Sequence, residues 1–329
     1  TRISALLQII RIEYMYTDTG EILLNTALEE SLNMENRKQK AKIYNMKANY
    51  LMTRGRFDEA VEVLKKQLNF EDPKSKGAAG AWINLGYCSS HRGNYPEAID
   101  FFEKGIQICR EIGEEEFQSN GLNNLSNVYL KQGEYDKTIE VLQKVKSLAA
   151  SAQNYRGLAA ASVNEGKAYE LKGNVSKAIE EYDKALKIQT QNGIVDGKAR
   201  VLSSLGTAYL EQDEFELASR YLHMSHDTAK HYQDLRETGV ALNNLGMLES
   251  SMGNREKAIE YYNRGLEIHR EVGNATGAIN ALNNLGTYLQ EDGKIDTALS
   301  VFMECLEINR IIGNRSGEAG ALINMGDTY

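Results

Sequence analysis

Apolar residues fall along the chain in paired runs of helical spacing, separated by short polar turns. Residues 241–274 contain one such pair. Its apolar side chains stand at Leu242, Leu245 and Leu248 before the turn, and at Ala258, Ile259, Tyr262 and Leu266 after it. Intervals of three and four residues place such side chains on one face of a helix. The pattern therefore predicts a helix, a tight turn at Gly253-Asn254 and a second helix.

The helix pair recurs with a period of 40 residues, shortened to 38 between the first two copies. The turn position holds Gly55, Gly93, Gly133, Gly173, Asp213, Gly253 and Gly293. Seven residues earlier stand the small residues Ala48, Gly86, Ser126, Gly166, Gly206, Gly246, Gly286 and, in a further copy, Gly326. Five residues after the turn stand Ala60, Ala98, Thr138, Ala178, Ala218, Ala258 and Ala298. A large apolar residue follows four positions later, at Leu64, Phe102, Leu142, Tyr182, Leu222, Tyr262 and Phe302.

The residues around the turns agree with helix ends. Glycine takes the left-handed backbone conformation that terminates a helix. Acids and proline are favoured in the first turn of the next helix, and they occur at Asp58, Pro96, Asp136, Glu216, Glu256 and Asp296. A second glycine set closes the second helix, at Gly113, Gly193, Gly273 and Gly313. Each copy is thus predicted to be helix A, turn and helix B.

This set of small, alanine and large apolar positions resembles the tetratricopeptide repeat. The resemblance covers roughly residues 41–329 and implies an all-α fold, a right-handed superhelical solenoid of antiparallel helix pairs. The usual repeat has about 34 residues and ends in proline, whereas this one has 40 and lacks that proline. Longer helices are therefore expected, as in the extended repeats of Pins/LGN-type adaptors, kinesin light chains and MalT-type bacterial regulators.

The markers divide the chain into three parts. Residues 1–40 fit the repeat poorly and are predicted to form a divergent helical pair, with helical patterns at Ile3–Tyr16 and Glu21–Met34 joined by residues 17–20. Seven repeats follow, at about 41–78, 79–115, 116–155, 156–195, 196–235, 236–275 and 276–315. Residues 316–329 are expected to be the first helix of a further, truncated repeat, which predicts a fragment of a longer protein or an end without fixed structure.

The resemblance also implies which side chains of helix A line the concave surface. One such position lies two residues before the small marker and holds Asn84, Asn124, Asn164, Ser204, Asn244, Asn284 and Asn324. The residue before it adds Asn45, Asn123, Asn243 and Asn283. Asparagine is a mediocre helix former because its amide competes for backbone hydrogen bonds, so its repetition in mid-helix calls for another explanation.

Two interpretations of these asparagines remain open. A side-chain amide both donates and accepts, so a row of amides can hold the backbone of an extended peptide regardless of its sequence. Helices ~8–10 Å apart match ~2–3 residues of extended chain. Alternatively, the amides bond to the neighbouring repeat and only fix the stacking.

Three cations stand at inward positions in the middle of the chain: Lys131, Lys167 and Arg200. They are candidates for contact with an acidic side chain of a ligand, and the alternative is that they are ordinary solvated charges. The Lys/Arg cluster with which chaperone-tail-binding members of the family hold a terminal carboxylate is absent here.

Composition excludes several functions. The net charge is −8, without a basic stripe, so no nucleic-acid partner is expected. No apolar run is long enough to insert into a membrane. The three cysteines, Cys88, Cys109 and Cys305, are too few and scattered for a disulfide framework and favour a reducing, cytoplasmic compartment. His223, His226 and His231 lack the further ligands of a metal site, and no catalytic motif occurs.

The sequence therefore predicts a non-enzymatic adaptor without metal or cofactor, whose partner is a protein or an extended peptide. The alternative is the regulatory arm of a larger signalling protein, such as a transcription activator, a histidine kinase or a CHAT-type protease, which responds to a peptide or protein. Self-association through the open C-terminal helix is a further expectation.

Overall fold

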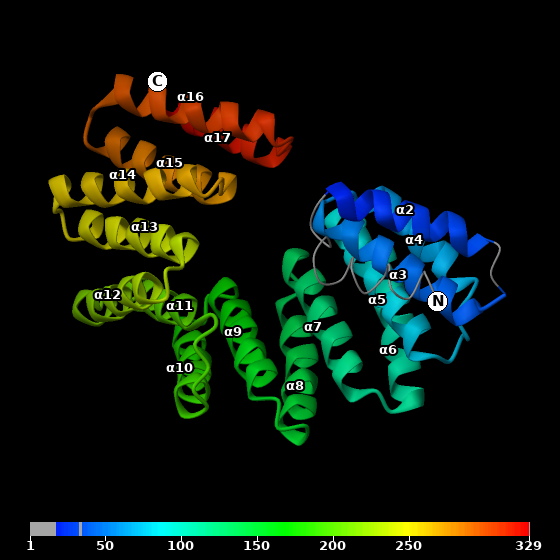
Figure 1. Ribbon diagram of the computed structural model, residues 1–329. Helices are drawn as coiled ribbons and strands as arrows, with labels where there is room; N and C mark the ends of the chain where they lie inside the picture. The colour runs from blue at the N-terminus through cyan, green and yellow to red at the C-terminus, as the bar shows by residue number, and fades with distance from the viewer. Residues whose placement is uncertain (1–17, 33–34, 329) are drawn as a thin grey trace. The chain divides into compact units, whose positions relative to one another are not determined.

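The computed structural model describes residues 18–32 and 35–328, and within them it contains sixteen α-helices and no strand (Figure 1). The helices of the first half are α2 (Asp18–Leu32), α3 (Arg37–Thr53), α4 (Phe57–Leu68), α5 (Lys76–His91), α6 (Tyr95–Ile112), α7 (Glu115–Lys131), α8 (Tyr135–Ser151) and α9 (Tyr155–Leu171). Those of the second half are α10 (Val175–Gln191), α11 (Lys198–Leu210), α12 (Phe215–His231), α13 (Leu235–Ser251), α14 (Arg255–Glu271), α15 (Ala275–Glu291), α16 (Ile295–Ile311) and α17 (Arg315–Thr328). The all-α prediction is confirmed.

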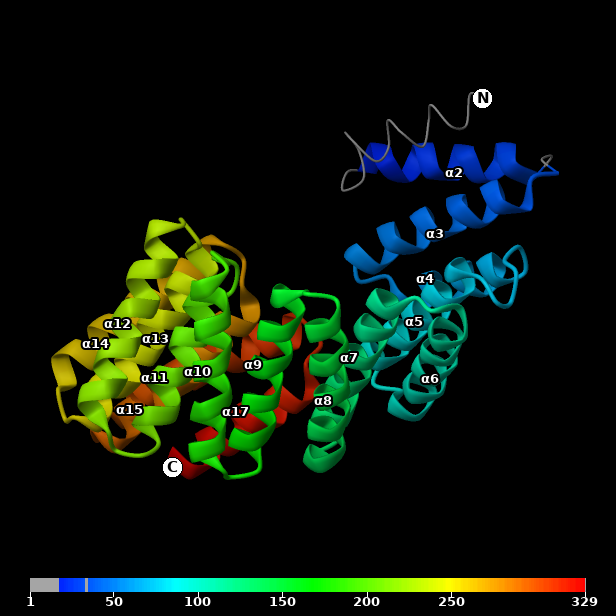
Figure 2. The same ribbon diagram turned by 90° about the horizontal axis from the view of Figure 1, so that it is seen from below.

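The helices form two compact units, one reaching to Lys172 and one beginning at Gly173. Within each unit every helix packs against the next in the chain, as α13 to α16 in Figure 1 and α3 to α8 in Figure 2 illustrate. The odd-numbered helices from α3 to α17 are the A helices of the predicted pairs, and the even-numbered ones from α4 to α16 are the B helices. Consecutive A helices of one unit also contact each other directly.

The turn residues adopt the predicted conformation. Gly93 has φ 77° and Gly253 has φ 76°, and Asp213, which replaces glycine in its copy, has φ 58°. The second glycine set is also left-handed. Two glutamines, Gln153 with φ 51° and Gln233 with φ 56°, occupy the same positions between helix pairs where other copies have glycine. The 40-residue period marks both positions, but glutamine, unlike glycine, gives no indication of a left-handed backbone.

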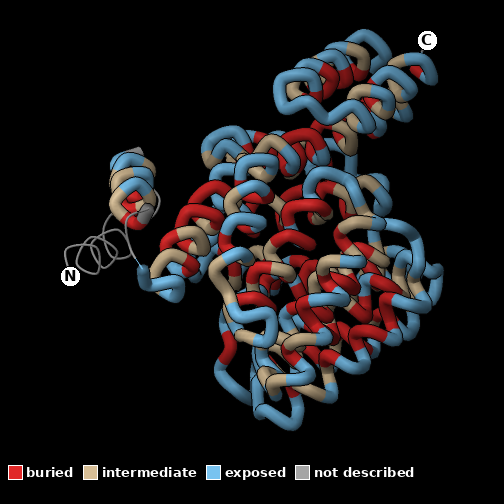
Figure 3. The backbone as a smooth tube through the Cα atoms, turned by 90° about the vertical axis from the view of Figure 1, so that its right-hand side faces the viewer, coloured by how far each residue is buried: buried red, intermediate tan, exposed pale blue. Residues whose placement is uncertain are grey.

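The small and large markers form a packing unit inside each pair. A Cβ atom placed on Gly286 would lie 2.5 Å from the ring of Phe302, and one on Gly246 would lie 2.7 Å from the ring of Tyr262. The marker alanines are fully buried. Figure 3 shows how buried and exposed stretches alternate along the helices. In the glycine copies a large B-helix side chain therefore packs directly on A-helix backbone, since the glycine there has no side chain.

The N-terminal segment differs in part from its prediction. The first expected helical pattern, Ile3–Tyr16, lies outside the described residues. The second is α2, which starts at Asp18 rather than after a turn ending at Gly20. Asp18 and Thr19 belong to its first helical turn.

Candidate peptide-binding surface

The predicted asparagines lie on the same side of successive A helices. We call this surface the A-helix face and define it by the positions two and three residues before the small marker and the position one residue after it. In the first unit the asparagine position holds Asn84 on α5, Asn124 on α7 and Asn164 on α9, and all three are half-buried. In the second unit, α13, α15 and α17 present Asn244, Asn284 and Asn324, also half-buried. The position after the marker is exposed at Tyr87, Lys167 and Thr287.

Four of the six asparagines donate a hydrogen bond to the preceding A helix. Asn164 Nδ2 donates to Asn123 Oδ1 at 3.0 Å, and Asn244 Nδ2 donates to Ser203 Oγ at 2.7 Å. The other two such bonds, each of 3.4 Å, join Asn284 to Asn243 and Asn324 to Asn283. In each bond the donor stands 41 residues after the acceptor, which is one 40-residue repeat plus one position. The second asparagine row therefore supplies most of the acceptors for the first.

Asn84 and Asn124 differ from the other four. The residue that would accept from Asn124 is Ile83, which is buried and has no side-chain acceptor. The corresponding residue for Asn84 is Asn45, whose Oδ1 accepts from Asn49 of the same helix at 3.1 Å instead. Within the described residues, neither Asn84 nor Asn124 forms a side-chain hydrogen bond. These two half-buried amides keep all of their donors and acceptors for another molecule.

The three predicted cations are in different situations. Arg200 donates to Glu237 Oε1 at 2.7 Å and 3.0 Å, and Lys167 pairs with Glu170 one turn later. Lys131, the last residue of α7, forms no ion pair within the described part of the chain. Of the three, only Lys131 thus keeps its charge available to a ligand.

An aromatic cluster that sequence reasoning missed lies beside Lys131. The His91 ring stacks on Phe57 at 4.7 Å between centroids and contacts Tyr87 at 4.4 Å. Burial, and secondarily the positive charge of Lys131, hold the pKa of His91 below its ordinary value, so this imidazole is neutral near pH 7. The contact between Tyr87 and His91 could have been predicted from their spacing, because residues four apart lie on one helix face.

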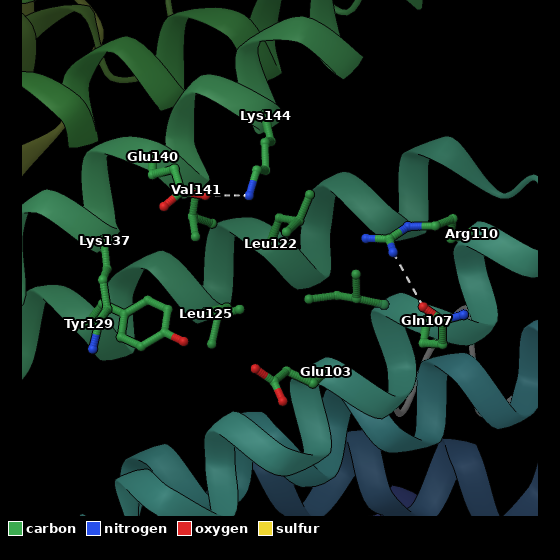
Figure 4. A pocket seen from close by; sticks show the side chains of 11 residues that line it. Glu103, Gln107, Arg110, Leu122, Leu125, Tyr129, Lys137, Glu140, Val141 and Lys144 are labelled. Carbon is green, nitrogen blue, oxygen red and sulfur yellow. Dashed lines mark hydrogen bonds and ion pairs between the residues drawn. The ribbon is translucent and has the colours of Figure 1, made fainter.

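A pocket of about 550 Å³ lies elsewhere in the first unit, between the B helices α6 and α8 (Figure 4). Leu122 and Leu125 of α7 line it together with Val141 of α8, and Glu103 and Tyr129 point toward each other across it. Burial, and then the charge of Glu103, raise the pKa of Tyr129. The second unit has a comparable pocket of about 500 Å³ between α12 and α14, above Leu242. Both pockets are lined by α7 or α13 residues other than the asparagines.

The described residues offer little chemistry beyond binding. They contain no group of three His, Cys, Asp or Glu side chains close enough to hold a metal ion. Cys88, Cys109 and Cys305 are buried and unpaired, and burial raises the pKa of the Cys109 thiol to about 11. No described helix is long and apolar enough to cross a membrane.

The comparison with family models decides the family. Five overlapping matches to a tetratricopeptide repeat model cover residues 77–311, and a further tetratricopeptide repeat model matches residues 41–71. The chain belongs to the tetratricopeptide repeat family. Because the matches follow the helix pairs α3–α4 and α5 to α16, the resemblance inferred from the glycine and alanine markers is confirmed.

Solved structures share the fold over most of the chain, and a curated relative matches part of it. A curated relative, response regulator aspartate phosphatase J of Bacillus subtilis, is 34% identical over 74 residues, which are 22% of this chain and 19% of its own length. Apo NprR of B. thuringiensis, a quorum sensor, superposes with a TM-score of 0.75 and 15% identity, covering 93% of this chain and 86% of its own. The apo form of RapI gives 0.69 and 16%, covering 83% and 99%. A Rap protein in complex with competence and sporulation factor gives 0.60 and 14%, covering 99% and 96%.

Proposed function

We propose that this chain is a non-catalytic protein-interaction scaffold that binds an extended peptide or a partner helix along the A-helix face of one unit. The observation that carries the proposal is the row of half-buried asparagines within each unit, on α5, α7 and α9 in the first and on α13, α15 and α17 in the second. A tetratricopeptide array offers a long, preformed surface, which lowers the entropy lost on binding. The ligand backbone would bond to the amides, and the side chains between them would set specificity.

The inter-repeat bonds leave room for such a ligand. An asparagine amide has two N–H donors and a carbonyl oxygen with two lone pairs. The bond from Asn164 to Asn123, for example, occupies one donor of Asn164 and one lone pair of Asn123. The remaining N–H and the Asn164 oxygen can pair with the C=O and N–H of a peptide. Fixing the stack and binding a ligand are therefore compatible roles.

The test compares two double variants in a binding screen of an extended-peptide library. Asn84→Ala/Asn124→Ala removes amides that have no side-chain partner among the described residues, whereas Asn164→Ala/Asn244→Ala also removes two inter-repeat bonds. Each hydrogen bond contributes about 0.5–1.5 kcal/mol. We therefore expect the first variant to weaken a library binder about tenfold or more while its melting temperature stays unchanged.

The second variant separates the two roles of the amides. It should weaken binding as well and should also melt earlier. Unchanged binding in both variants, with earlier melting of the second alone, would contradict the proposal and assign the asparagines to stacking.

A second candidate is a regulatory arm that responds to a bound peptide or protein. It is favoured by the superposition on NprR, described as a quorum sensor, and on a Rap protein solved with competence and sporulation factor. These superpositions rest on the fold, so the ligand and any attached output domain of this chain are part of the proposal.

The absence of catalysis is part of the same proposal. The curated relative is called a phosphatase, and the match to it spans 22% of this chain. Incubation with a phosphorylated response regulator is expected to leave the rate of phosphate loss unchanged. Acceleration by the chain alone, lost in Asn84→Ala/Asn124→Ala, would instead make the A-helix face a catalytic surface.

Self-association through α17 is the remaining proposal on partners. Leu322 and Ile323 of this helix are 51% and 62% exposed, and apolar exposure of this kind marks an interaction surface. Sedimentation velocity over a dilution series should show an oligomer that Leu322→Glu/Ile323→Glu dissociates. A monomer at all concentrations would remove this role. A cytoplasmic location and the lack of a nucleic-acid partner remain predictions.

A further inference from the structure

Four side chains on α5 and α7 mark the corners of a small patch in the first unit. Asn84 and His91 lie seven residues apart on α5, and Asn124 and Lys131 lie seven residues apart on α7. Seven residues are about two helical turns, or ~10 Å along the axis, so each pair shares one face of its helix. The two helices are in direct contact and packed helices lie ~8–10 Å apart. The patch is therefore roughly as long as it is wide.

The two ends of this patch differ in chemistry. At one end are the amides of Asn84 and Asn124, which form no side-chain hydrogen bond within the described residues. At the other end are the neutral ring of His91 and the ammonium group of Lys131, which has no anionic partner there. Tyr87, 37% exposed, lies between them and against the His91 ring. From one end of the patch to the other, the groups are therefore two amides, an aromatic surface and a cation.

We propose that this patch, Asn84, Tyr87, His91, Asn124 and Lys131, binds about three residues of an extended peptide with an apolar or aromatic side chain followed by a carboxylate. Three extended residues span ~10 Å, which matches the ~8–10 Å between packed helices. The backbone therefore crosses from Asn84 on α5 to Asn124 on α7, while its side chains reach along the helices toward His91 and Lys131. The peptide backbone bonds to the amides, its apolar side chain stacks on Tyr87 and His91, and its carboxylate pairs with Lys131. This assignment rests on the proposed function and adds the ligand's chemistry to it.

The same combination occurs at no other repeat. The residues at the position of Tyr87 in the other copies are Asn49, Asn127, Lys167, Thr207, Met247, Thr287 and Asp327, and none of them is aromatic. Those at the position of Lys131 in the other copies are Thr53, His91, Leu171, Glu211, Ser251 and Glu291, and none of them is a lysine or an arginine. The patch therefore anchors one particular segment of the ligand and fixes its register along the A-helix face.

The experiment uses fluorescence anisotropy with a labelled decapeptide based on a library binder, containing Phe followed two residues later by Asp and ending in an amide. A second peptide has Asn in place of Asp, and a third has Asn with a free C-terminal carboxylate. At low salt the Asp peptide should bind the wild type about five- to tenfold more tightly than the Asn peptide. That advantage should vanish in Lys131→Gln and shrink in high salt.

Two controls keep the outcome specific. Lys66→Gln, which removes an exposed lysine of α4, should keep the full preference for Asp. Tyr87→Ala should weaken the Phe peptide more than a version with Ala in place of Phe. If the third peptide binds as tightly as the first, Lys131 pairs with a terminal carboxylate as well as with a side-chain one, and the patch stands as the cation site.

The result that overturns the inference is a preference for Asp that persists in Lys131→Gln, or no preference in the wild type. The failure of the proposed function looks different: no library peptide binds the wild type, or binders are unaffected by Asn84→Ala/Asn124→Ala. Binding that depends on the amides but not on Lys131 would leave the scaffold proposal standing and remove only the patch.

Discussion

At the scale of single residues, the tightest packing lies where an A-helix glycine receives a large B-helix side chain. Gly286→Ala should lower the free energy of unfolding by about 1–3 kcal/mol, because the new methyl group would overlap the fully buried ring of Phe302. Gly326 is its matched control: it occupies the same position one repeat later and has no neighbouring atom in the way. Gly326→Ala should leave stability unchanged or raise it by up to about 1 kcal/mol. Equal effects in urea unfolding would refute this account.

A buried histidine gives the second prediction at this scale. His269 is 1% exposed, forms a hydrogen bond of 3.1 Å with Asn274, and is closely surrounded by Gly239 and Gly277. Burial, and then the charge of Arg236, lower its pKa in the folded state. The unfolded chain therefore binds the proton more strongly, so stability should fall as the pH falls below about 6.5, the ordinary pKa of histidine.

The variant that checks this is His269→Gln, since Gln189 already fills the equivalent position two repeats earlier. The urea midpoint of the wild type should drop between pH 7.5 and pH 5.5 by more than that of the variant. His91 also has a lowered pKa and contributes to both proteins, so only the difference between them reports on His269. Parallel pH profiles would exclude His269 as the cause.

At the scale of elements, the turns between helix pairs are not equally relaxed. Gln153 and Gln233 adopt a left-handed conformation that costs a residue with a side chain about 1–2 kcal/mol. Gln153→Gly should therefore raise the free energy of unfolding by about 0.5–1 kcal/mol, after the larger entropy of glycine in the unfolded chain is subtracted. The neighbouring Ala152 has an ordinary φ of −82°, so Ala152→Gly should be destabilising instead. A loss of stability in both variants would contradict the strain argument.

Most helix ends were predictable because the chain marks them with glycine, which readily adopts the left-handed conformation that ends a helix. The turn position was recognised even at Asp213, where glycine is missing. Gln153 and Gln233 escaped because glutamine has no preference of its own for the left-handed conformation, so only the period and not the residue type points to a turn there. The start of α2 was placed three residues late, because the residue types Asp and Thr are as common in a turn as in the first turn of a helix.

The candidate surface was only half predictable. The asparagine rows follow from the period, and the offset of one position beyond a repeat explains in retrospect why Asn164 has an acceptor whereas Asn124 faces Ile83. The fate of the cations depends on more distant residues: Arg200 is neutralised by Glu237 on the next A helix, while no described carboxylate pairs with Lys131. Pairings of this kind arise from side-chain reach across helices, which a periodic pattern does not encode.

At the scale of the whole molecule, the two candidate functions predict different responses to a ligand. A scaffold with a preformed surface should keep its radius of gyration in solution X-ray scattering when saturated with a library peptide. A regulatory arm should become more compact, because a ligand transmits a signal only by favouring one of two conformations. We expect an unchanged radius, with Asn84→Ala/Asn124→Ala as the control that does not bind.

The hydrogen bonds that join four of the A helices to the preceding one bear on how such a chain tolerates changes in length. Removal of residues 244–283 would bring Asn284 into the place of Asn244, opposite Ser203, and Phe302 into the place of Tyr262, with the repeat register unchanged. A deletion that also starts at residue 244 but is one residue shorter or longer would rotate the rest of the helix by about 100°. The small glycine positions would then no longer face the large B-helix side chains, and the amides would no longer face their acceptors. Within the helices, length can therefore vary only by whole repeats, which makes the gain or loss of one complete repeat the mildest large mutation available to this protein.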